Sequence, residues 1–139
     1  PEDVRLKVEG NEDVLRAGFE TAFEISSGEG YGDQSQVKVY LLSDEADFFH
    51  LKVNSRARYL IYSHSRHNTW ADLYRVDAAG GIRPIAGSGD GVTVVIDGQD
   101  YTQNFFFDMV LDPGDYYLRV VPEGGSTGTY SLRVWAAQE

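Results

Sequence analysis

Short segments of alternating apolar and polar residues, separated by turn-forming residues, run through most of this 139-residue chain. An alternation with a period of two is the pattern of a strand that buries one face, whereas a helix needs apolar residues three or four apart. The expected strands cover residues 49–53, 59–63, 71–76, 92–96, 105–111, 116–121 and 130–135. Short strands at hairpin spacing predict one all-β domain over residues 1–139, an antiparallel jelly-roll-like sandwich.

The N-terminal third of the chain is less regular. Residues 4–8 and 37–41 alternate as strands do, and turn formers lie between them at 10–13 and 26–33. Residues 15–23 carry apolar side chains at mixed spacing, which allows at most one short helical turn. No other helix is expected.

Composition excludes several classes of partner and site. Twenty-two acidic residues against 12 basic ones give a net charge of −10, and such a surface repels nucleic acid and anionic lipid. No apolar run approaches the ~18 residues of a spanning helix, and the start at Pro1 does not resemble a signal segment, so we expect no membrane insertion and a leader, if any, already removed. The lack of cysteine excludes disulfides, thiolate metal sites and cysteine nucleophiles, but leaves the compartment open.

A catalytic centre is not expected. His50, His64 and His67 are the only neutral-pH bases, and no nucleophile motif surrounds the serines near them. His64 and His67 could together bind zinc, but no third ligand is near them in sequence, so a solvated loop is favoured. Glu45 and Asp47 could serve glycoside hydrolysis only if they faced each other across a cleft, whereas residues two apart on one strand share one face.

The last two strands predict a binding surface. Burial of Tyr116, Leu118 and Val120, and likewise of Tyr130, Leu132 and Val134, leaves the alternate residues on the opposite face. If the two strands pair as a hairpin, rings and guanidinium groups share one outer face, where they could bind a polar ligand or simply pack across strands. The predicted ligand-binding residues are Tyr62, Trp70, Tyr117, Arg119, Arg133 and Trp135.

Several motifs, in order, resemble the bacterial pre-peptidase C-terminal domain family, which is appended to secreted proteases and collagenases. Asn11-Glu12-Asp13 followed by Thr21-Ala22 is similar to the family's opening, and Glu45-Ala46-Asp47-Phe48-Phe49 is similar to its Asp-x-Asp-Tyr-Phe signature. The hairpin at 73–80 resembles Leu-Tyr-Asp-x-x-Gly, interrupted by Arg75-Val76. The segments 114–120 and 128–134 resemble the closing Gly-x-Tyr-Tyr-x-x-Val and Gly-x-Tyr-x-Leu-x-Val.

The resemblance implies a β-sandwich that acts outside the cell. It also implies a calcium site, because in collagen-binding relatives the opening stretch and the signature acids supply oxygen ligands, here matched by Glu12, Asp13, Glu45 and Asp47. Glu45 departs from the aspartate of the signature, and an acidic loop without an ion is the alternative.

Three hypotheses about function follow. The first is a secreted or cell-surface accessory domain, not an enzyme, that binds a matrix protein, polysaccharide or peptide, with calcium as a structural support. The second is a structural spacer or folding module within a larger secreted protease or adhesin. The third, a small enzyme, lacks a convincing base and nucleophile.

Overall fold

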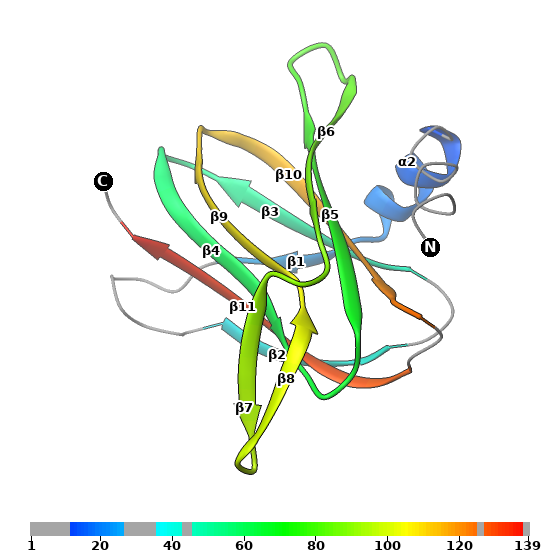
Figure 1. The fold of residues 1–139 in the computed structure, drawn as a ribbon. Helices are drawn as coiled ribbons and strands as arrows, with labels where there is room; N and C mark the ends of the chain where they lie inside the picture. Colours follow the sequence, from blue (N-terminus) through cyan, green and yellow to red (C-terminus); the bar gives the residue numbers. More distant parts are fainter. Residues whose placement is uncertain (1–11, 27–35, 43–45, 125–126, 138–139) are drawn as a thin grey trace.

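The computed structural model describes residues 12–26, 36–42, 46–124 and 127–137, with the backbone alone for Glu12 and residues 36–42. One helix and eleven strands are present in this part of the chain (Figure 1). In order they are α2 (Glu12–Glu20), β1 (Phe23–Ile25), β2 (Gln36–Leu42), β3 (Asp47–Val53), β4 (Ala57–His64), β5 (Thr69–Val76), β6 (Ile82–Ser88), β7 (Val92–Ile96), β8 (Gln99–Asn104), β9 (Phe106–Leu111), β10 (Gly114–Pro122) and β11 (Gly128–Ala137).

The strands form two packed sheets and a separate hairpin. Sheet A has the order β1-β3-β10-β5-β6, sheet B has the order β2-β11-β4-β9, and β7 pairs only with β8. All pairs are antiparallel except β1 with β3. From β2 to β5 and from β9 to β11, each strand lies in the opposite sheet from the strand before it. The described fold is an all-β sandwich, as the alternating sequence predicted.

The hydrophobic core lies between the two sheets. Sheet A contributes Phe49 and Leu51 of β3 and Leu118 of β10, whose neighbours across the sheet are set by the register Leu118↔Phe49 and Leu118↔Leu73. Sheet B contributes Ile61, Phe107, Leu132 and Val134, among others, from every second position of β4, β9 and β11. This alternation of buried and partly exposed residues is what a half-buried sheet requires.

The helix differs from the expected single turn. It spans nine residues from Glu12 and begins earlier than the predicted 15–23. Leu15 and Phe19 are four residues apart and therefore share one face, and Leu15 is 1% exposed. The chain leaves the helix at Thr21, whose amide donates to the Gly18 carbonyl. No helix of the described residues is long and apolar enough to cross a membrane.

One further sequence prediction lies outside the described residues, and another is wrong. The predicted strand at 4–8 lies outside them. The proposed hairpin of β10 with β11 is wrong, because β10 pairs with β3 and β5 while β11 pairs with β2 and β4. The two strands are successive in sequence but belong to opposite sheets, so their outer faces point in opposite directions (Figure 1).

Candidate functional site

The helix α2 covers part of the outer face of sheet A. Leu15, Gly18 and Phe19 face this sheet, and a methyl group added at Gly18 would lie 2.5 Å from the Phe48 ring. The glycine therefore lets the helix backbone approach β3 closely. The side chains directly beneath the helix, such as Phe48, contact the helix instead of solvent.

Tyr117 lies beneath the helix in a stack of three rings. Its ring is 4.1 Å from that of Phe19 at an interplanar angle of 12°, and 4.6 Å from that of His50 at 19°. The predicted strand phase is confirmed, because Tyr116 is 2% exposed and Tyr117 points to the other face. Both ring surfaces of Tyr117 are nevertheless occupied within the domain.

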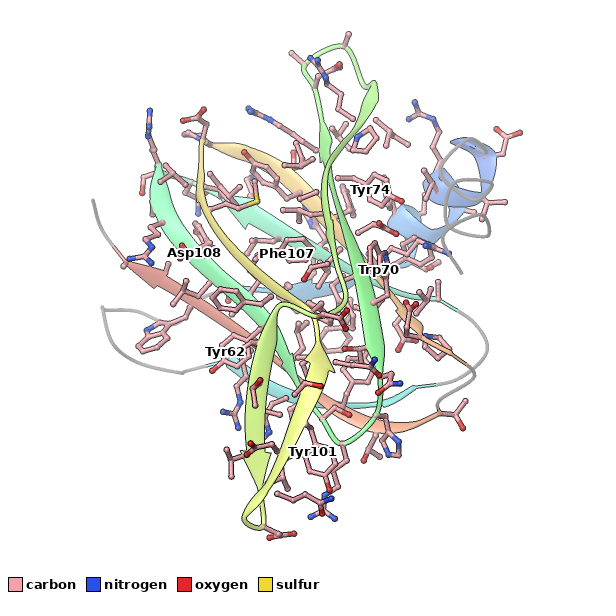
Figure 2. All side chains as sticks on the ribbon, in the orientation of Figure 1. Tyr62, Trp70, Tyr74, Tyr101, Phe107 and Asp108 are labelled. Carbon is pink, nitrogen blue, oxygen red and sulfur yellow. The ribbon has the colours of Figure 1, made fainter. Side chains whose placement is uncertain are left out.

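Arg119 is buried, so the prediction that it lies exposed on a binding face is wrong. Its side chain is 4% exposed, and its Nη1 donates to Asp72 Oδ2 at 3.1 Å. Trp70 Nε1 donates to the other oxygen of the same carboxylate at 3.0 Å. The indole of Trp70 also covers Gly87 and Gly89, where an added methyl group would overlap it. Arg119 and Trp70 therefore belong to a buried polar cluster on sheet A. Figure 2 labels Trp70 and Tyr74 on β5.

His50 connects three strands on the same outer face. Its Nδ1 lies 2.7 Å from Glu24 Oε2 of β1, and its Nε2 lies 2.9 Å from Asp115 Oδ1 of β10. Burial lowers the pKa of His50, but the hydrogen bonds and negative charges of Asp115 and Glu24 outweigh burial and raise the pKa above its ordinary value of 6.5. The protonated ring donates to both carboxylates and lies against the Tyr117 ring.

We expect this arrangement to make stability depend on pH. A histidine whose pKa is raised by folding stabilises the folded state fully below the unfolded pKa of about 6.5, and the effect is lost as pH rises through the folded pKa. The difference in unfolding free energy between the wild type and His50→Gln should therefore shrink as pH rises from about 6 to about 9, measured by urea denaturation. A difference that is constant or grows over that range would contradict the arrangement.

The outer face of sheet B carries a row of partly exposed side chains. On this face Tyr62 and Leu60 of β4 alternate with the buried Tyr59 and Ile61, and Arg133 and Trp135 of β11 alternate with buried Leu132 and Val134. The register places Arg133 opposite Tyr62 and Trp135 opposite Leu60. The helix α2 contacts β3 of sheet A and lies on the far side of β5 from β4 and β9 (Figure 1).

On this face, side chains that are neighbours across β11, β4 and β9 form rows, and adjacent rows carry aromatic rings and cations. Tyr62 and Phe106 of β9 are 5.9 Å apart between ring centroids, and Arg133 continues the same row. In the next row Leu60 lies between Asp108 of β9 and Trp135 of β11. The Asp108 carboxylate receives two 2.7 Å hydrogen bonds from Arg58. The Arg58 guanidinium lowers the pKa of Asp108 below its ordinary value. Figure 2 shows Tyr62 and Asp108 on this sheet.

A shallow pocket of about 110 Å³ opens at the end of the face. Its lining residues are Arg58, Leu60, Trp135, Ala136 and Ala137. The pocket combines one aromatic ring, three aliphatic side chains and one guanidinium group. Such a set fits a ligand that offers both an apolar surface and hydrogen-bond acceptors.

The structure therefore separates the six predicted ligand-binding residues. Tyr62, Arg133 and Trp135 come together on the outer face of sheet B, while Trp70, Tyr117 and Arg119 lie on the outer face of sheet A. Leu60 and Phe106 of the sheet B face were not predicted. The alternation along β4 would have identified Leu60, but the pairing of β9 with β4 cannot be inferred from periodicity.

The predicted calcium ligands are only partly described. Glu45 and the side chain of Glu12 lie outside the described residues, and Asp13 is exposed at the start of α2. Asp47 Oδ2 accepts a 2.7 Å hydrogen bond from the hydroxyl of Tyr130, which links β3 to β11. Within the described residues, no group of three His, Cys, Asp or Glu side chains is placed to hold a metal ion.

The serines near the histidines have structural roles. Ser65 Oγ donates to the Thr129 carbonyl at 2.9 Å and accepts from the His67 amide at 2.9 Å. Ser63 Oγ bonds to Thr69 Oγ1 at 2.7 Å and to Asn104 Oδ1 at 2.8 Å, in a buried cluster. These bonds hold the end of β4 against β8 and β11.

Comparison with solved structures supports the fold. The chain is similar to the pre-peptidase C-terminal domain of collagenase from Bacillus anthracis, with a TM-score of 0.55, 20% identity, and coverage of 81% of this chain and 93% of that one. No family model and no curated protein sequence matches. The fold is therefore that of a pre-peptidase C-terminal domain, which confirms what the sequence motifs predicted about the fold.

Two further similar structures come from proteins with other roles. PliG of Aeromonas hydrophila, a periplasmic lysozyme inhibitor of g-type lysozyme, has a TM-score of 0.51, 12% identity, and coverage of 84% of this chain and 97% of that one. CorA of Methylomicrobium album BG8, a surface-associated copper-binding protein, has a TM-score of 0.50, 9% identity, and coverage of 84% and 98%. At these identities the similarity describes the fold alone, and the role has to be argued from this chain's own residues.

Proposed function

We propose that this chain is a secreted or cell-surface, non-catalytic accessory domain that binds a polymer or protein surface through the outer face of sheet B. The observation that carries the proposal is the convergence of the partly exposed side chains of Tyr62, Arg133 and Trp135 on one face. Rings and a guanidinium in adjacent rows are the groups that dominate binding energy at recognition surfaces.

The similar structures support the same kind of role. The pre-peptidase C-terminal domain belongs to a collagenase, PliG is an inhibitor, and CorA is associated with a surface. The serine hydroxyls beside the histidines are engaged in structural hydrogen bonds, which argues against a nucleophile there. Calcium is a second part of the proposal, with Glu12, Asp13, Glu45 and Asp47 as its ligands.

The test is a panel of immobilised glycans and matrix proteins, probed with and without calcium. Against any ligand that binds, Trp135→Ala should weaken the affinity by about tenfold or more, because a large ring at the centre of a contact is a typical hot spot. Phe23→Ala is the matched control, since Phe23 is an exposed ring, 48% accessible, on the edge strand of sheet A. Thermal unfolding of each variant checks that the fold is retained.

Each outcome of the panel has a clear meaning. Equal loss in both variants would place the ligand elsewhere, and no binding across the whole panel would favour the spacer hypothesis. A melting temperature that rises in millimolar calcium for the wild type, and not for Asp47→Asn, would support the ion. An unchanged melting temperature would reject it.

A further inference from the structure

A second hollow lies at the other end of the sheet B face. It has a volume of about 200 Å³ and lies between the connection from β4 to β5, strand β7 and strand β11. We call it the histidine groove. Its lining residues are His64, Ser65, Arg66, His67, Ile96, Thr129, Tyr130 and Ser131.

The titratable side chains of the histidine groove favour a negative ligand. Two histidines and one arginine line it, and none of its lining residues is an aspartate or glutamate, although the whole chain carries a net charge of −10. The hydroxyl groups of Thr129 and Ser131 add further hydrogen-bond donors. A set of hydrogen-bond donors with no carboxylate among the lining residues, on an acidic protein, is the arrangement expected of an anion site.

Hydrogen bonds from side chains to the backbone fix the shape of the histidine groove. Ser65 ties the loop to Thr129, and the Asn104 side-chain amide donates to the Ser65 carbonyl at 3.0 Å. The imidazole of His67 lies directly over Gly128, where a methyl group would overlap it. A site fixed in this way loses little conformational freedom when a ligand binds.

Charges around the histidines come from three elements. Arg66 is paired with Asp97 in the turn between β7 and β8. Burial and then the positive charge of Arg133 on β11 lower the pKa of His64 below 6.5. Tyr130 donates its hydroxyl to Asp47 on β3. A carboxylate in the groove would offset the repulsion between His64 and Arg133 and so favour protonation of His64.

We propose that the histidine groove binds the carboxylate of an acidic polysaccharide that lies along the outer face of sheet B. The inference rests on the proposed function for the position of the polymer. An acidic peptide is less suited, because β4 and β11 are interior strands paired on both sides, so a peptide main chain would find no free ladder there. Sugar rings need no ladder and can lie against Tyr62 and Trp135.

The test uses tetragalacturonate and its fully methyl-esterified form, which has the same backbone without the charge. By isothermal titration calorimetry the acidic form should bind the wild type about tenfold more tightly than the ester, since a hydrogen bond to a charged group is worth about that factor. The double variant His64→Gln with His67→Gln should lose that preference. His50→Gln, a histidine on sheet A, is the matched control and should keep it.

The pH dependence separates an anion site from a metal site. Affinity for tetragalacturonate should rise as pH falls from about 8 to about 5.5, because a carboxylate bound in the groove favours the protonated form of His64. A metal ion held by the same histidines would bind more weakly as they are protonated. Affinity that falls or stays constant with falling pH would overturn the proposal.

The results can distinguish failure of the histidine-groove proposal from failure of the proposed binding face. Equal binding of both oligosaccharides, weakened by Trp135→Ala, would reject the histidine groove and keep the binding face. No binding of either would reject the acidic polysaccharide, while the panel of other polymers still tests the face. Polyglutamate that binds as tightly, with the same dependence on the two histidines, would replace the polysaccharide with an acidic peptide.

Discussion

Replacing Arg119 with alanine is expected to destabilise the domain by about 3–5 kcal/mol, because it leaves a buried carboxylate without its cation. The Asp72 and Arg119 side chains are 5% and 4% exposed, so water cannot take over the lost interaction. Trp70 would still donate to Asp72, but a neutral donor does not balance the charge. Urea denaturation of the wild type and of Arg119→Ala measures the loss.

The control is removal of both charges together. The double variant Arg119→Met with Asp72→Leu replaces the pair by apolar side chains, and it should be clearly more stable than either Arg119→Ala or Asp72→Ala. Single variants that cost less than about 1 kcal/mol would mean that Arg119 reaches solvent, and the exposed position first predicted for it would be restored.

The second large effect is expected at Tyr116, where alanine should cost about 3–5 kcal/mol. The ring is 2% exposed in the core, its hydroxyl donates to the Asp112 carbonyl at 2.9 Å, and the Arg75 guanidinium lies 5.5 Å from the ring centre. Tyr116→Phe keeps the ring and should cost only about 1 kcal/mol. Comparable losses for the two variants would show that the hydrogen bond, and not burial of the ring, stabilises this position.

Tyr117→Ala should have a smaller and local effect. It removes two stacked contacts, each worth about 0.5–1.5 kcal/mol, and leaves the core between the sheets intact. Because Phe19 would lose its stacked partner, amide exchange should accelerate first in α2. From the sequence alone Tyr117 was expected to bind a ligand, whereas the structure gives it a role in attaching the helix.

Periodicity predicted the phase of β10 and β11 well. Tyr116 and Leu118 alternate with Tyr117 and Arg119 as the sequence indicated, and the same holds for β11. Periodicity says which side chains share a side, but not what lies over that side. Arg119 is on the predicted side and is still buried, where it is paired with Asp72 of β5.

Strand pairing is the second feature that the sequence did not predict. β10 and β11 are joined by a short connection rich in glycine, which suits a hairpin as well as a crossing from one sheet to the other. The unpredicted strands have equally clear causes. β8 is almost entirely polar because its hairpin with β7 projects from the sandwich (Figure 1), and β6 contains Pro84 and Gly87, which weaken a strand pattern.

The most direct test of the binding role is a map of the contact surface by nuclear magnetic resonance, recorded while a ligand from the panel is titrated into the labelled domain. The amides that shift should belong to Ala57–His64 of β4 and Gly128–Ala137 of β11, the strands that carry Tyr62, Arg133 and Trp135. Shifts concentrated instead in α2, β3 and β5 would place the ligand on sheet A and contradict the proposed face.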